Sequence, residues 1–262
     1  MTIKNSDICR CCNSTTKEIF SGTLLNYQVR YFECVSCGYV QTETPHWLDE
    51  AYVEAINISD TGIMARNQVN ARIVIATMLL LGKLNGTLVD SAGGYGILVR
   101  LLRDYGVNAL WSDRYCQNLL ASGFEHTTES ADLVTVFEAF EHFVNPAEEL
   151  DRLLTIAPNV LLSTEVIADP APKQEDWWYY GKNHGQHIGF FRIRTMEKLA
   201  RDRGKYLLSN GTSYHLISDS PLNQTAWKML MKMNKFVPLL LRKSLTQSDC
   251  DFLMKKYNQG TN

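Results

Sequence analysis

The chain has 262 residues, of which 45% are hydrophobic and 21% are charged. This is enough for one substantial domain, or for one domain with a small appendage, in a soluble globular protein. The formal net charge of -2 supplies no field that would attract a polyanion, so composition argues against nonspecific nucleic-acid binding. The opening residues lack the apolar core of a signal peptide. The most apolar run, 73–82, has about half of the roughly 20 residues that span a bilayer. We expect a cytoplasmic protein without a membrane partner.

The cysteines are concentrated at the start of the chain. Cys9 and Cys12 form one C-x2-C pair and Cys34 and Cys37 form a second, with 21 residues between the two pairs. Two-residue spacing lets both sulfurs of a pair face one ion, and four thiolates in a tetrahedron are what structural Zn²⁺ prefers. In a reducing compartment such a pattern favours a metal site over disulfides. All four protein positions would be filled, which predicts a structural rather than a catalytic zinc.

The segment between the two cysteine pairs contains β-branched and aromatic residues around a glycine, as a zinc-ribbon hairpin would. Cys11 breaks the spacing and is expected to be a non-ligand. The alternative is a set of unpaired cysteines in a small subdomain. We assign residues 1–45 to a zinc-ribbon-like segment whose folding depends on the metal.

The rest of the chain reads as an α/β protein. Residues 46–82 are expected to hold connecting helices over 46–58 and 63–82. Residues 83–220 alternate strands with helices, which predicts a Rossmann-like, doubly wound and mostly parallel sheet. The expected strands are 87–91, 107–112, 132–137 and 159–164. The expected helices are 95–105, 115–121, 146–156 and 195–203.

Two further strands, 205–209 and 213–218, are separated by Asn210-Gly211, which predicts that the sheet ends in an antiparallel hairpin. Residues 221–262 are expected to form an amphipathic helical tail. A helix packed on the domain is favoured there over a partner-binding helix.

A glycine-rich turn follows the first predicted strand, in the sequence VDSAGGYG at 89–96. In a doubly wound sheet, ligands bind beyond the carboxyl ends of the strands. Asp90 ends the first strand, and Asp113 ends the second, where a carboxylate can accept both hydroxyls of a ribose. A purely structural turn followed by an unrelated surface aspartate is the alternative.

These motifs, together with DLVTVFEAFEHFVNP at 132–146, resemble those of class I S-adenosylmethionine-dependent methyltransferases over roughly residues 60–218. The resemblance implies that the turn lines the amino-acid part of the cofactor, that Asp113 holds its ribose, and that Phe137 and Glu138 lie beside cofactor and substrate. The turn residues implied are Asp90, Ala92, Gly93, Gly94 and Gly96. Ala92 stands where the first glycine of the family is usual, and its methyl group predicts a narrower turn.

Dinucleotide oxidoreductases are the competing family because they share the sheet. Their pyrophosphate requires G-x-G-x-x-G spacing to place amides and a helix N-terminus against phosphate. Here the spacing is A-G-G-Y-G, with the bulky Tyr95 in the turn. A ligand without phosphate at this point tolerates the turn better, which favours S-adenosylmethionine.

Two stretches could supply substrate chemistry: FEAFEHF, with Glu138, Glu141 and His142, and the aromatic loop 169–191. The loop alternatively uses its aromatic side chains only to plug the end of the sheet. A cysteine-pair head on this core, with GQHI at 185–188, is similar to bacterial sugar C-methyltransferases. That resemblance implies a Glu-His pair as the base, with Gln186 at the glutamate position and His187 at the base position.

The predicted function is methyl transfer from S-adenosylmethionine to a small-molecule acceptor, such as a sugar or carbohydrate-derived metabolite. A histidine with an ordinary pKa near 6.5 suits proton removal from the acceptor at neutral pH. His187 is the first candidate for the base, followed by His184, Glu138 and His142. Two alternatives stay open: an RNA methyltransferase that grips nucleic acid with its zinc ribbon, and a noncatalytic scaffold. The sequence leaves the oligomeric state undetermined.

Overall fold

The computed structural model describes residues 6–52, 60–240 and 243–260. The chain divides into two compact units. Unit 1 comprises Met1–Asn57, Val136–Thr155 and Asn159–Pro221, and unit 2 comprises Ile58–Thr135, Ile156–Pro158 and Leu222–Asn262. The predicted boundaries at residues 45, 82 and 220 stay a prediction.

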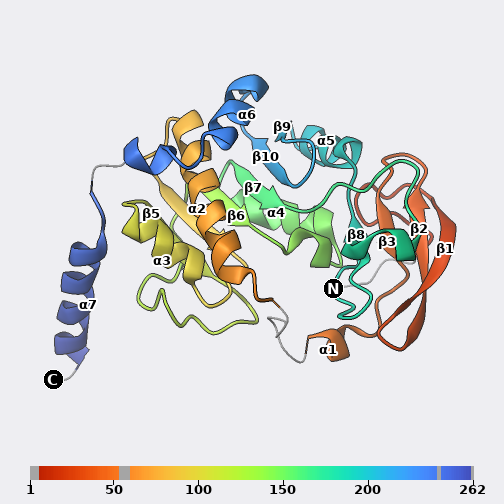
Figure 1. The fold of residues 1–262 in the computed structure, drawn as a ribbon, viewed down its shortest axis with the longest axis horizontal. Helices are drawn as coiled ribbons and strands as arrows, with labels where there is room; N and C mark the ends of the chain where they lie inside the picture. The colour runs from red at the N-terminus through yellow and green to blue at the C-terminus, as the bar shows by residue number, and fades with distance from the viewer. Residues whose placement is uncertain (1–5, 53–59, 241–242, 261–262) are drawn as a thin grey trace. The chain divides into compact units, whose positions relative to one another are not determined.

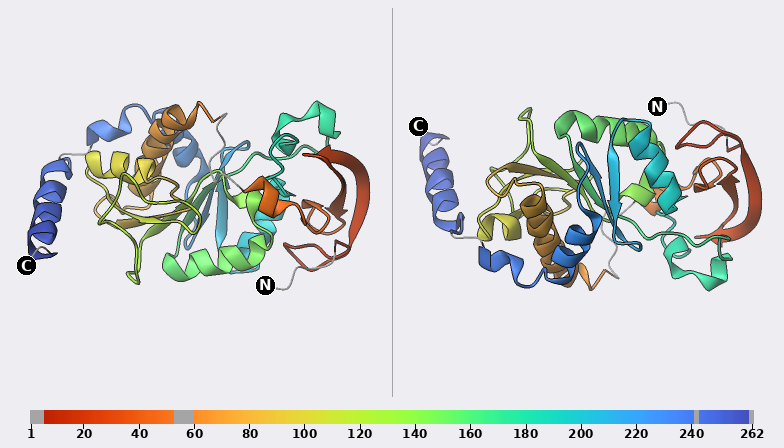
Figure 2. Two further views of the ribbon diagram at one scale, coloured as in Figure 1. Left: turned by 90° about the horizontal axis from the view of Figure 1, so that it is seen from below. Right: turned by 90° about the horizontal axis from the view of Figure 1, so that it is seen from above.

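A small antiparallel sheet in unit 1 contains the predicted ribbon hairpin. Its strand order is β1 (Thr16–Leu24), β2 (Tyr27–Cys34), β3 (Val40–Thr42) and β8 (Gly189–Phe190). The register of β1 against β2 shifts between Glu18 and Phe20, and Figure 2 shows the hairpin strongly bent along its length. A bulge of this kind bends a strand and increases its twist. Strand β8 was not expected from the sequence, because two residues are too few to show a strand pattern.

The larger sheet has six strands in the order β5-β4-β6-β7-β10-β9. Strand β4 pairs in parallel with both β5 and β6, and β10 pairs antiparallel with both β7 and β9. The predicted α/β sheet with a terminal antiparallel hairpin is therefore confirmed. The strands are β4 (Thr87–Ser91), β5 (Asn108–Ser112), β6 (Leu133–Val136), β7 (Val160–Ser163), β9 (Tyr206–Ser209) and β10 (Tyr214–Ser218).

Most predicted helices form close to their expected ranges. In unit 2, α2 packs against both α3 and α6, as Figure 1 shows. Of the predicted connecting helix 46–58, the structure shows only α1 (Leu48–Ala51), and residues 53–59 lie outside the described part of the chain. The other helices are α2 (Ile63–Leu80), α3 (Ile97–Asp104), α4 (Pro146–Ile156), α5 (Ile193–Arg201), α6 (Gln224–Lys232) and α7 (Thr246–Gly260), with 3-10 turns at Phe140–His142, Gln174–Asp176, Trp178–Tyr180 and Val237–Leu240. Within the described ranges, no helix is both long and apolar enough to cross a membrane.

The predicted helix over 115–121 is wrong. This segment is irregular, and several of its backbone amides bond to side chains, while those of Leu119 and Leu120 donate to the Tyr95 carbonyl. The Asp113 carboxylate accepts from the amides of Tyr115 and Cys116, and the Asn118 side chain accepts from the Ala121 amide. Short polar side chains that capture nearby amides compete with the helical hydrogen bonds.

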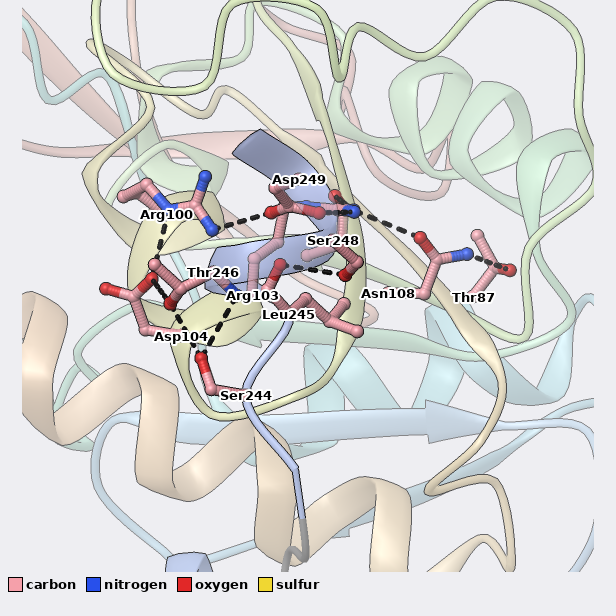
Figure 3. Close-up of polar contacts among 11 residues, drawn as sticks. Thr87, Arg100, Arg103, Asp104, Asn108, Ser244, Leu245, Thr246, Ser248 and Asp249 are labelled. Carbon is pink, nitrogen blue, oxygen red and sulfur yellow. Dashed lines mark hydrogen bonds and ion pairs between the residues drawn. The ribbon is translucent and has the colours of Figure 1, made fainter. Parts of the chain in front are cut away.

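Contacts of α6 and of the start of α7 attach the tail of the chain to the rest of unit 2. Trp227 of α6 is fully buried, and its indole N–H donates to Thr77 Oγ1 of α2 at 3.2 Å. At the start of α7, Asp249 accepts hydrogen bonds from Arg103 at 2.7 and 2.8 Å and from Arg100 at 2.7 Å, as Figure 3 shows. The beginning of the tail is thus packed on the domain, as predicted. Further along α7, Phe252, Met254 and Tyr257 are at least half exposed.

The core of unit 1 joins the ribbon hairpin to the aromatic loop. Buried side chains of β1, β2 and β3 pack against side chains of loop 167–190. Tyr31 lies edge-on to Tyr180 with ring centroids 5.3 Å apart, and Trp47 donates its indole N–H to the Gly185 carbonyl. Much of the aromatic density in the loop therefore serves packing, although Trp178 is 79% exposed.

Candidate functional site

The glycine turn in unit 2 begins at the carboxyl end of β4, which lies between β5 and β6. A ligand site is expected where strand order reverses in this way. Asp90, at the end of β4, is only 3% exposed, and the Thr135 hydroxyl of β6 donates to it at 2.6 Å. Burial raises the pKa of Asp90 to about 7, and the nearby Asp113 carboxylate adds to the rise. A cationic ligand beside Asp90 would lower this pKa again and favour the ionised carboxylate.

The turn itself is held by the neighbouring strand. The amides of Ala92 and Gly93 both donate to the Ser112 carbonyl, at 2.9 and 3.1 Å. A Cβ at Gly93 would lie 2.8 Å from Trp111 of β5, so only glycine fits there. Ala92 has φ +73°, in the left-handed region that favours glycine. The alanine therefore strains the turn without preventing it, which gives a physical reason for the glycine usual at this position.

Asp113 is held against the turn. Its Oδ2 accepts from the Gly94 amide at 2.9 Å, and its Oδ1 accepts from the amides of Tyr115 and Cys116 at 2.7 and 2.9 Å. These three bonds fix the orientation of the carboxylate, which has about four lone-pair sites in all. The structure thus brings Asp90, Ala92, Gly93, Gly94, Gly96 and Asp113 together in unit 2.

Phe137 and Glu138 follow directly after β6 in the chain and belong to unit 1. Glu138 has φ +50°, a strained value for a non-glycine residue. Ser163, at the end of β7, accepts from the Glu138 amide at 2.8 Å and donates to the Glu138 carboxylate at 2.6 Å. Two hydrogen bonds to one serine thus hold Glu138 in its strained conformation.

A second polar cluster in unit 1 consists of Glu141, His142 and His187. Glu141 is fully buried, and Nε2 of each histidine lies 3.9 Å from its Oε1. Neither carboxylate oxygen of Glu141 has a hydrogen-bond partner among the described residues. Burial raises the pKa of Glu141 to about 8, and the Glu138 charge adds to this, while the nearby hydroxyls of Tyr179 and Thr164 moderate the rise.

His187 and the neighbouring His184 differ in which ring nitrogen is free. His187 Nδ1 lies 2.6 Å from the Tyr179 carbonyl, which can only accept, so this nitrogen carries the proton and Nε2 keeps a lone pair. Burial lowers the pKa of His187 to about 4. His184 Nδ1 accepts from the Gln186 amide, so a neutral His184 carries its proton on Nε2 and offers no free lone pair.

Gln186 occupies a structural position. Its side-chain amide donates to the Ala51 carbonyl at the end of α1, at 2.8 Å, and the residue is only 7% exposed. The glutamine found where the sugar C-methyltransferase resemblance implies a glutamate therefore ties the loop to α1.

The four paired cysteines lie together at the ribbon. The distances are 3.6 Å from Cys9 Sγ to Cys37 Sγ and 3.5 Å from Cys12 Sγ to Cys34 Sγ, and all four sulfurs lie within 4.8 Å of one another. Sulfurs about 2.3 Å from one tetrahedral zinc would be about 3.8 Å apart, so the set fits such an ion. The amides of Cys11 and Cys37 donate to cysteine sulfurs, and Gly38 has the positive φ of a knuckle turn.

Helix α5 braces this cysteine cluster through backbone contacts. Thr195 donates its hydroxyl to the Cys37 carbonyl at 2.9 Å, and Arg192 donates to the Gly38 carbonyl at 3.0 Å. On the other side, the buried Arg10 donates to the carbonyls of Thr42 and Ile188. These groups fix the backbone around the cysteines.

Sequence reasoning missed several residues that shape these sites. Thr135 holds Asp90, Trp111 walls the turn, and Thr195 and Arg192 brace the cysteines. A threonine inside the otherwise apolar strand 133–136 was the one local signal for Thr135. The other contacts join residues far apart in the sequence, and no local pattern reports them.

The fold and the glycine turn define the class of this protein as a Rossmann-like α/β core. Residues 65–210, more than half of the chain, match the family model described as a methyltransferase domain. The chain therefore belongs to the methyltransferase-domain family, as its resemblance to class I enzymes indicated. A search of curated protein sequences gives no match.

Solved structures that align with part of the chain include TnmH, at 16% identity and a TM-score of 0.41, covering 67% of this chain and 62% of that one. An O-methyltransferase family protein from Burkholderia thailandensis aligns at 12% identity and a TM-score of 0.43, covering 66% of this chain and 67% of that one. The mitomycin 7-O-methyltransferase MmcR aligns at 14% identity and a TM-score of 0.43, covering 66% and 60%. The chain thus spans about three-fifths of TnmH, and similarities at this level do not identify an acceptor.

Proposed function

We propose that the protein transfers a methyl group from S-adenosylmethionine to a small-molecule acceptor, such as a sugar or a carbohydrate-derived metabolite. The observation that carries this proposal is the turn after β4, with Asp90 beneath it and Asp113 hydrogen-bonded to it. The turn lacks the glycine spacing that binds a pyrophosphate. The match of residues 65–210 to a methyltransferase family also supports the proposal.

In this proposal the turn holds the methionine part of the cofactor. Residues 92–96 bring backbone close to the ligand, and the Asp90 carboxylate faces its positive charge. Asp113 accepts the ribose hydroxyls with its remaining acceptor capacity. Phe137 and Glu138 are the further residues proposed to line the cofactor and acceptor.

The acceptor must lose a proton before or during attack on the methyl carbon if its nucleophile is a hydroxyl or an enolisable carbon. We assign this task to the histidine cluster of unit 1, with His187 first because its Nε2 lone pair is free. His184 ranks lower than the sequence suggested, since both its nitrogens are committed. Glu138 and His142 remain further candidates.

Zinc is proposed as a structural ion at Cys9, Cys12, Cys34 and Cys37. Four protein ligands would leave no position for water or substrate, so the ion would stabilise the ribbon and take no part in methyl transfer.

The test is calorimetry with S-adenosylmethionine, S-adenosylhomocysteine and NAD on one sample of the full chain. We expect the first two to bind and NAD to give no signal. Asp113→Asn should weaken cofactor binding, whereas Asp251→Asn, a matched change on the exposed face of α7, should leave it unchanged. Binding of NAD with no response to the other two would overturn the proposal.

The acceptor class is tested with S-adenosylmethionine carrying a labelled methyl group. We expect label in the small-molecule fraction of a metabolite extract, and loss of labelling in His187→Ala with cofactor binding retained. Label recovered in RNA would favour the alternative enzyme, and a His187→Ala protein that methylates its acceptor at full rate would remove the assigned base.

A further inference from the structure

We infer that Glu141, His142 and His187 form a second divalent transition-metal site, separate from the four cysteines. One donor atom from each of the three residues lies within 4.8 Å of the other two. The set consists of two imidazole nitrogens and one carboxylate oxygen. Such sets hold catalytic Zn²⁺ and non-haem Fe²⁺ in proteins, whereas Mg²⁺ and Ca²⁺ prefer oxygen ligands.

The buried carboxylate is the first observation that points to a ligand. Glu141 is completely buried, and both its oxygens lack hydrogen-bond partners within the described part of the chain. An unpaired buried carboxylate is expensive, and the structures that retain one pair it with a cation or coordinate a metal. Here two imidazole nitrogens face the carboxylate. The described ion-pair partners of Glu141 include no lysine or arginine.

The histidines are oriented for coordination through Nε2. The Nδ1 atom of His187 donates to the Tyr179 carbonyl, and the Nδ1 atom of His142 lies 2.8 Å from the Tyr52 hydroxyl. Metal-binding histidines almost always engage the other ring nitrogen in such a hydrogen bond, which fixes the ring and its tautomer. Both Nε2 atoms lie 3.9 Å from the same carboxylate oxygen.

The two nitrogen-to-oxygen separations need only a small contraction around an ion. Ligand distances of about 2.0–2.1 Å with tetrahedral angles place donor atoms about 3.4 Å apart. The two nitrogen-to-oxygen distances are therefore about half an ångström too long, which small side-chain movements can supply. His184 does not join the set, because its Nδ1 is taken by the Gln186 amide.

Three protein ligands leave at least one coordination position open, unlike the four cysteines. The existence of the metal site does not depend on the proposed function. The role of the ion in methyl transfer does rest on it. An acceptor hydroxyl bound at the open position would have its pKa lowered, as bound water has. His187 would then promote proton loss as a metal ligand rather than as the base.

The site is tested by equilibrium dialysis of the full chain against micromolar Zn²⁺, followed by measurement of zinc per chain. We expect the wild-type protein to saturate at two equivalents, and Glu141→Gln and His187→Gln to saturate at one. The remaining equivalent, held by the cysteines, shows that each variant is folded at the ribbon. His126→Gln, a change at a half-buried histidine that belongs to neither candidate metal site, should keep both equivalents.

The zinc affinity of a further variant and the visible spectrum of bound Co²⁺ distinguish metal coordination from a merely structural role of these residues. Tyr52→Phe removes the hydrogen bond to His142 and should weaken the second equivalent roughly 10–100-fold, whereas the ligand variants should abolish it. Co²⁺ added to the chain after one equivalent of Zn²⁺, which fills the cysteine site first, should give visible bands without the thiolate charge-transfer absorption of a cysteine site. Saturation of the wild type at one equivalent, or of Glu141→Gln at two, would overturn the inference, while cofactor binding, measured separately, decides the proposed function.

Discussion

Ala92 is the residue at which the sequence departs from the usual family pattern, and the structure gives the departure an energetic meaning. Its φ of +73° costs an alanine about 1–2 kcal/mol, while glycine avoids this cost but is more flexible in the unfolded chain by about 0.4–1 kcal/mol. We expect Ala92→Gly to raise the free energy of unfolding by about 0.5–1 kcal/mol in urea titrations. Ala147→Gly, in α4, should lower it. Equal losses in both variants would show that the turn is not strained at Ala92.

Asp90 carries a second prediction at this scale. Because burial raises its pKa to about 7, the folded state binds more protons than the unfolded state between about pH 4 and pH 7. The contribution of Asp90 to stability is therefore full below about pH 4 and is lost as the pH rises through about 7. Asp90→Asn cannot titrate, so its unfolding free energy should exceed that of the wild type by up to about 4 kcal/mol at pH 8. The same variant should bind S-adenosylmethionine more weakly.

The comparison is made by urea unfolding at pH 4, 6 and 8. The difference between Asp90→Asn and wild type should grow steadily with pH. A difference that stays constant would mean that Asp90 is ionised throughout this range, and that burial has not raised its pKa.

At the scale of elements, α7 depends on one ionic contact. Asp249 accepts two hydrogen bonds from Arg103, whose side chain is 8% exposed, and one from Arg100. Removing one partner of a buried pair leaves the other charge uncompensated, at a cost of about 3 kcal/mol. We expect Asp249→Ala to release residues 246–260, detected as faster amide hydrogen exchange there. Asp251→Ala, on the same helix, is the control, and unchanged exchange in both variants would contradict the anchoring role.

Elements with strong apolar periodicity or clear turn signals could be predicted from the sequence. Helix α2 and strands β4, β6 and β7 follow their apolar patterns, and the final hairpin follows Asn210-Gly211. The side chain of Asn210 accepts from three amides of that turn. The helix over 115–121 failed because Asp113 captures the amides that would start it, a contact that apolar periodicity does not reveal.

The candidate sites show the same division. The glycine turn and the cysteine pairs are each encoded by close spacing, so their members could be named in advance. The cluster of Glu141 and His187 joins residues 46 positions apart through a loop whose path the sequence does not specify. The unpaired state of Glu141 depends on burial by neighbours from several elements, so only the structure could reveal it.

At the scale of the whole molecule, the cysteine cluster is expected to stabilise helix α5 as well as the ribbon. Thr195 of α5 and Arg192, which caps the start of α5, bond to the carbonyls of Cys37 and Gly38, so loss of the proposed zinc should loosen residues 189–201 as well as residues 9–42. We expect chelation to increase amide hydrogen exchange in both segments. Helix α3, in the other unit, should remain protected. Exchange that rises only in residues 9–42 would show that α5 does not depend on the ion.

The pairing of β3 with β8 has a consequence for synthesis of the chain. Strands β1, β2 and β3 are complete once residue 42 has been made, but their partner at Gly189–Phe190 follows almost 150 residues later. Until then the outer side of β3 is an unpaired strand edge of the kind that recruits other chains. Contacts so distant in sequence form late, because a long loop must close first. A nascent chain that stalls before residue 189 would therefore expose a half-built sheet, and the window for aggregation would close only when β8 leaves the ribosome and docks.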